Sequence, residues 1–181
     1  MGEVIPATGK APVSLASTFE DLEAFYGKAK EVAACLGAPL EKLERFAPQL
    51  SGFAAEVKAK REPITQQELA LELELIVCAF PNGKAEPDFV AIMVCAIAAM
   101  RPSIGAVQLA RRELINKCKS LPAISEVREA IEEMTKFLDT VARRIHEFPL
   151  CLSFMKECRQ LYPRPRVGRA RARHKGPILT S

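Results

Sequence analysis

Hydrophobic residues recur at helical spacing along most of the chain, and the alternation of apolar and polar residues that marks a half-buried strand is nearly absent. The longest run covers residues 124–148, where apolar residues follow one another at spacings of three and four. Its members are Ile124, Val127, Ile131, Met134, Leu138, Val141, Ile145 and Phe148. We therefore predict an all-α fold, a helical bundle with a long C-terminal seam helix over 122–148.

Helix boundaries follow from capping residues and prolines. Residues 17–20 and 65–68 have the Ser/Thr-x-x-Glu spacing of a capping box, in which two side chains bond the free backbone N–H groups at a helix start. Pro48 and Pro149 are expected to interrupt their helices, because proline lacks a backbone N–H. The predicted organisation is a flexible leader over 1–16, a helical hairpin over 17–62, a bundle over 63–161 and a disordered basic tail over 162–181.

Residues 89–100 form the longest apolar run without a charge. A helix that is hydrophobic all round is usually enclosed by its neighbours, so we expect this helix at the centre of the bundle, with Ile97 buried. Its twelve residues fall short of the roughly 20 that a membrane-spanning helix needs. The run is therefore assigned to the core of a soluble protein, and no membrane partner is predicted.

The helices on either side of this run carry opposite charges. In the preceding helix, Glu68, Glu72 and Glu74 are expected on the solvent side. In the following helix, apolar residues are expected to face inward and the basic side chains to face water. These basic residues, candidate contacts for a polyanion, are Arg111, Arg112, Lys117 and Lys119.

The 124–148 seam is compatible with two arrangements. Its spacing is that of a two-stranded coiled coil. However, Ala130, Phe137 and Ala142 widen the apolar stripe, and the positions flanking the seam offer no pairs of opposite charge to select a partner chain. Packing of this helix within its own bundle, or against the N-terminal hairpin, and a homodimer through 124–148 are both open on the sequence.

Composition argues against catalysis and metal binding. The chain has two histidines, and its six cysteines form no C-x-x-C pair. Phosphate-binding glycine loops, a GxSxG elbow and an HExxH helix are absent from the sequence. No catalytic residue, metal or cofactor is predicted, and His146 is interpreted as structural. The cysteines are interpreted as buried free thiols of a cytoplasmic protein, with a redox pair at Cys151 and Cys158 as the alternative.

Positive charge is concentrated at the C-terminus. Residues 159–181 carry seven Lys or Arg and no Asp or Glu, whereas residues 1–158 carry 19 basic and 22 acidic residues. Guanidinium groups suit phosphates and carboxylates, so this tail is predicted to contact nucleic acid or an acidic protein, with a merely solubilising tail as the alternative. The candidate contacts are Arg159, Arg164, Arg166, Arg169, Arg171, Arg173 and Lys175.

A helix capped at Thr65 and closed by Pro81 is followed by a second helix, and a basic helix then meets the turn at Leu121 and Pro122 before a further helix begins. In this order of elements, residues 65–133 resemble the phage-encoded loader and inhibitor proteins of replicative helicases. The resemblance implies a non-catalytic DNA-replication accessory protein that binds a replicative helicase and modulates its delivery to DNA. The alternative hypotheses are a nucleic-acid-binding regulator that acts through the Arg-rich tail without a helicase, and a small enzyme.

Overall fold

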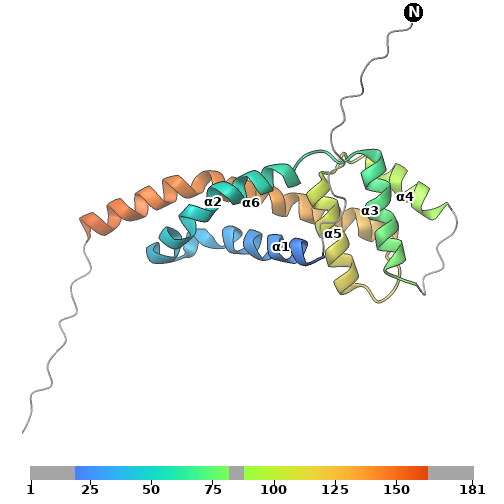
Figure 1. Ribbon diagram of the computed structural model, residues 1–181, viewed down its shortest axis with the longest axis horizontal. Helices are drawn as coiled ribbons and strands as arrows, with labels where there is room; N and C mark the ends of the chain where they lie inside the picture. Colours follow the sequence, from blue (N-terminus) through green and yellow to red (C-terminus); the bar gives the residue numbers. More distant parts are fainter. Residues whose placement is uncertain (1–18, 82–87, 163–181) are drawn as a thin grey trace, which may run out of the picture.

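The computed structural model describes residues 19–81 and 88–162, and in these ranges the protein is all-α (Figure 1). The predicted leader over 1–16, Ser17 of the first predicted capping box and the tail from residue 163 onward lie outside the described residues. The elements are α1 (Phe19–Ala33), a 3-10 turn η1 (Cys35–Gly37), α2 (Leu40–Lys60), α3 (Gln66–Cys78), α4 (Phe89–Ala98), α5 (Ile104–Lys117) and α6 (Ile124–Leu161).

The long helix α6 packs against α1, α2 and α5 and touches α4, whereas α3 packs on α4 and α5 (Figure 1). The α1–α2 hairpin lies along its C-terminal part, and α3, α4 and α5 gather around its N-terminal part. The seam predicted from the sequence faces these helices, as the single-chain alternative expects. Its buried members are Val127, Ile131, Met134, Leu138, Val141 and Phe148.

The second predicted capping box is confirmed at the start of α3. The backbone N–H of Glu68 donates to Thr65 Oγ1 at 3.2 Å, and the N–H of Thr65 donates to Glu68 Oε2 at 2.9 Å. The Thr65 hydroxyl also donates to Glu68 Oε2, at 2.7 Å. The hydrogen bonds that the Glu68 carboxylate accepts from the hydroxyl and the backbone N–H of Thr65 lower its pKa, because they favour its charged form.

The predicted breaks at Pro48 and Pro149 are wrong, because α2 and α6 continue through both prolines. Both prolines are exposed, so water can bond the carbonyl oxygen that each one leaves without a donor. Beside them, Phe46 of α2 and Phe148 of α6 pack with their ring centroids 6.2 Å apart. This contact holds the two proline-containing turns together. Its packing offsets the free energy lost with the helix hydrogen bond that each proline removes.

The predicted place of the apolar helix is also wrong. Ile97 is fully buried, as expected, but α4 packs chiefly on α3 at one end of the molecule, and Ile92 is 55% exposed. The enclosed helix is α5, in which Ala106, Val107 and Leu109 have no exposed surface. Small residues let neighbouring helices approach α5 closely, whereas hydrophobicity alone does not tell how many neighbours a helix has.

The end of α2 and the first turn of α5 approach each other closely. A Cβ atom placed on Gly105 would lie 2.6 Å from both the Cβ and the carbonyl oxygen of Lys60. The loops beside this contact are joined by two backbone hydrogen bonds: Ile64 N–H donates to Pro102 O at 3.1 Å, and Ile104 N–H donates to Glu62 O at 3.0 Å. The glycine is therefore required for this crossing.

Substitution Gly105→Ala is expected to lower the free energy of unfolding by about 2 to 3 kcal/mol, because the new methyl group meets a backbone carbonyl that cannot rotate away. Urea unfolding of the two chains measures the change. The matched control is Gly52→Ala in α2, where nothing lies within 4 Å of the added Cβ. That control should leave stability unchanged or raise it by up to about 1 kcal/mol, because alanine favours the helix. Equal effects of the two substitutions would contradict the close approach.

Candidate protein-binding surface

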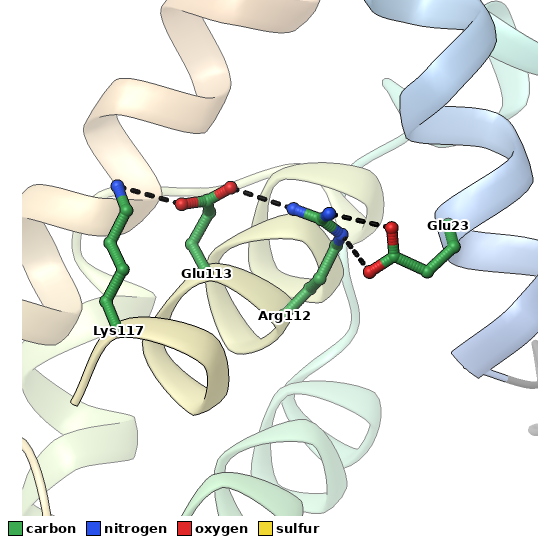
Figure 2. Close-up of polar contacts among 4 residues, drawn as sticks. All are labelled: Glu23, Arg112, Glu113 and Lys117. Atoms are coloured by element: carbon green, nitrogen blue, oxygen red, sulfur yellow. Dashed lines mark hydrogen bonds and ion pairs between the residues drawn. The ribbon is translucent and has the colours of Figure 1, made fainter. Parts of the chain in front are cut away.

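Two basic side chains of α5, Arg112 and Lys117, are paired with carboxylates (Figure 2). Arg112 Nη2 donates to Glu23 Oε2 of α1 at 2.7 Å, and its Nη1 donates to Glu113 Oε1 at 2.8 Å. Lys117 Nζ lies 2.8 Å from the other carboxylate oxygen of Glu113. The Arg112 guanidinium also covers the ring of Tyr26, with its central carbon 4.0 Å from the ring centroid.

These contacts stabilise the charged forms of the groups involved. The hydrogen bond to Glu23 raises the pKa of Arg112, against the opposing effect of burial. Burial by itself raises the pKa of Glu113. Three contacts outweigh burial, so that the pKa is lowered: the hydrogen bond and ion pair with Lys117, the hydrogen bond from Tyr26 and the charge of Arg112. Glu113 therefore stays ionised between two cations.

Arg111 belongs to a second, more buried polar chain. Its Nε lies 3.2 Å from Glu72 Oε2, Gln108 Nε2 donates to Glu72 Oε1 at 3.0 Å, and Lys60 Nζ donates to Gln108 Oε1 at 2.6 Å. The prediction that Glu72 faces solvent is wrong, because Glu72 is only 4% exposed. Burial lowers the pKa of Lys60, although the charges of Glu56, Glu72 and Asp21 oppose this shift.

The polyanion face predicted at α5 is therefore largely neutralised within the molecule. Arg111 and Arg112 have only 14% and 13% of their side chains exposed, whereas Lys117 and Lys119 are exposed. Arg159 at the end of α6 is exposed, with its Nη1 3.4 Å from Glu41 Oε1. The remaining tail candidates, from Arg164 to Lys175, lie outside the described residues.

The cysteines are not uniformly buried, contrary to expectation. Cys35 is buried, Cys78 and Cys95 are exposed, and the other three are intermediate. Cys151 and Cys158 are seven residues apart in the continuous helix α6, which places their Cα atoms about 10.5 Å apart. A disulfide spans at most about 7 Å between Cα atoms, so the two cannot pair within this helix. His146 is exposed.

A surface feature that sequence reasoning missed lies on α3 and α4. The outward positions of α4 are exposed and uncharged, and α3 exposes Leu71, Leu75 and Cys78, spaced by four and three residues on one face of the helix. We call this the α3–α4 surface. It comprises Leu71, Leu75, Cys78, Ala91, Ile92, Cys95 and Ala98. The signal was present in the sequence, because no charge on residues 89–100 was available to mark a solvent face.

A groove of 560 Å³ runs between α3 and α4 and borders this surface. Its apolar lining is Ala70, Val90, Ala91, Val94 and Cys95, and its polar lining is Gln66, Gln67 and Glu74. Within the described residues of 62–81 and 88–100 there is no Lys or Arg. The acidic residues of these two ranges are Glu62, Glu68, Glu72, Glu74 and Asp88.

Two other surface features differ in character. A pocket of 490 Å³ lies between the 61–63 and 100–103 loops and α6, and its lining mixes Arg61, Arg101 and Lys136 with Glu132 and Asp139. These opposite charges give the pocket no marked preference for the charge of a ligand. The C-terminal part of α6 exposes a separate apolar stripe. Its members are Leu150, Phe154 and Leu161, which are 71%, 64% and 74% exposed.

Comparison with protein-family models, with curated proteins and with solved structures finds no match to this chain. Among the described residues, no helix combines the length and apolar character needed to span a membrane. The same part of the chain holds no group of three or more His, Cys, Asp or Glu side chains placed to bind a metal ion.

The charge chain at α5 predicts a dependence of stability on pH. Because the folded pKa of Glu113 lies below the ordinary value of 4.5, its contribution is present above that value and is lost as the pH falls through the folded pKa. At pH 7, Glu113→Gln should lower the free energy of unfolding by about 0.5 to 1 kcal/mol, after allowance for solvent screening.

Urea unfolding at a series of pH values tests this expectation. The stability difference between wild type and Glu113→Gln should shrink as the pH is lowered below 4.5, because the wild-type carboxyl group becomes neutral as well. Glu129→Gln, at an exposed position of α6, is the matched control and should change little. A stability difference for Glu113→Gln that stays constant across this pH range would contradict the charge chain.

Proposed function

We propose that this protein is a non-catalytic accessory factor that binds a replicative helicase through the α3–α4 surface and modulates its delivery to DNA. The observation that carries the proposal is the exposed apolar side chains on two adjacent helices, among them Ile92 of α4, which is 55% exposed. Contiguous exposed apolar surface on a folded domain is typical of a protein-binding site.

The resemblance to helicase loaders supports the choice of partner, because α3 and α4 both lie within residues 65–133. The pairing of Arg111 and Arg112 with carboxylates supports the choice of surface. Paired, mostly buried cations contribute little to binding a phosphate backbone, so the body of the protein offers an apolar contact more readily than a basic one.

Substitution Ile92→Lys is expected to weaken capture of the hexameric helicase by the full-length chain about tenfold or more, because an unpaired lysine would be buried at the interface. The helicase is captured from host lysate treated with nuclease, because the nuclease removes contacts mediated by nucleic acid. Leu150→Lys is the matched control, because Leu150 is 71% exposed on the separate stripe of α6. Both chains should keep the unfolding free energy of the wild type.

Capture of the helicase by Ile92→Lys at the wild-type level would contradict the assignment of the surface. Absence of the helicase from the wild-type capture would contradict the assignment of the partner. Loss of capture by Leu150→Lys alone would place the contact on α6 instead.

The second candidate function is nucleic-acid binding through the Arg-rich tail, favoured by the seven basic residues of 159–181. Deleting residues 163–181 removes six of the seven, since Arg159 remains. If all six contact phosphates of single-stranded DNA, the logarithmic salt slope of binding should fall by about 4, at roughly 0.7 per contact. An unchanged affinity for DNA after the deletion would contradict this candidate.

A further inference from the structure

We propose that the groove between α3 and α4 binds an amphipathic helix with basic flanks, presented by the partner protein. This inference rests on the proposed function, because it assumes that the α3–α4 surface binds a protein. It specifies the chemistry of the segment that is bound. The argument uses the shape of the groove, the size of its lining residues and the sign of the charge around it.

The shape of the site suits a helix. The groove lies between two neighbouring helices and has a volume of 560 Å³. A helix lies in such a groove by inserting apolar residues spaced by three and four positions. Ala70, Ala91 and Cys95 line the groove with small side chains, and Val90 and the buried Val94 complete its apolar lining. Small lining residues leave space for larger side chains, such as leucine, on the bound helix.

The charge around the site selects a basic partner. Glu74 lines the groove and is exposed, and Asp88 is exposed at the start of α4. No basic side chain is present in the described residues of 62–81 and 88–100 to offset them. Complementary charge steers a partner toward an interface and rejects partners of the same sign. The bound helix should therefore carry Lys or Arg beside its apolar face.

The same charge argues against a second copy of this surface as the occupant. A symmetric pairing of two α3–α4 surfaces would bring acidic residues of both chains together, without a cation from either helix to separate them. Like charges brought together across an interface oppose association. An amphipathic basic helix of another protein would complement both the apolar lining and the acidic rim of the groove, which is formed by Glu74 and Asp88.

The test uses a synthetic helix of 18 residues as the probe, with leucines spaced by three and four and all other positions lysine. A matched peptide carries glutamate in place of lysine. Fluorescence anisotropy at low salt measures the affinity of both peptides for the full-length chain. The lysine peptide should bind at least about tenfold more tightly than the glutamate peptide, because like charges on the rim oppose the latter. Equal affinities, or tighter binding of the glutamate peptide, would overturn the inference.

Charge reversal at the rim provides a sharper measurement. Glu74→Lys should lower the affinity for the lysine peptide about threefold to tenfold and raise the affinity for the glutamate peptide by a similar factor. If the substitution only disturbed the local structure, the affinity for both peptides would fall. Loss of affinity for both peptides, or for neither, would therefore overturn the assigned role of Glu74.

The location of binding is tested with a lysine placed inside the groove. Ala91→Lys should reduce binding of the lysine peptide at least about tenfold, since it adds bulk and like charge at an exposed position of the lining. Leu150→Lys should leave binding unchanged. Unfolding curves for Ala91→Lys should match the wild type. Binding that is insensitive to Ala91→Lys, or lost in Leu150→Lys, would overturn the groove as the site.

Two further results separate this inference from the proposed function. If the lysine peptide binds the groove but no helicase is captured, the groove inference stands and the helicase assignment fails. If the helicase is captured equally by wild type and by Ala91→Lys, the helicase assignment stands and the groove inference fails. Deletion of 163–181 should leave peptide affinity unchanged. A rise in affinity after this deletion would assign the groove to the chain's own basic tail.

Discussion

The arrangement of the described residues depends on the enclosure of α5. This helix lies against α1, α2, α3 and α6, and Gly105 allows its first turn to meet the backbone of α2. Once α5 is enclosed, its cations lose much of their contact with water, and a buried charge without a partner is costly. Each neighbouring helix that carries a carboxylate toward α5 removes part of that cost. Glu23 of α1 and Glu72 of α3 have this role.

This internal pairing determines which surfaces are available for partners. Arg111 and Arg112 are occupied by contacts that hold α1 and α3 on α5, so they bind parts of the protein itself rather than a polyanion. At the far side of α3, by contrast, α4 adds a second helix with no charged residue. The result is a molecule whose centre is stabilised by ion pairs and whose α3–α4 end presents apolar side chains with acidic residues around them.

Prolines and apolar runs show where local reasoning is insufficient. Pro48 and Pro149 are strong local signals for a helix end, yet both helices continue because Phe46 and Phe148 pack beside them. The run at 89–100 is the most reliable local signal for a core helix, yet its outer face has no neighbour among the described residues. In both cases the deciding energy comes from residues distant in the chain.

The all-α class, the capped start of α3, the burial of Ile97 and the inward face of the 124–148 seam are all readable from the sequence. These features depend on residues only a few positions apart, whose spacing fixes one face of a helix or one cap. The tertiary structure alone decided which helix is enclosed and which charges are free. Arg112 meets Glu23 across 89 positions of sequence, and no local pattern specifies a contact over that separation. The outer face of α4 and the paired cations of α5 thus both follow from how the helices are placed around one another.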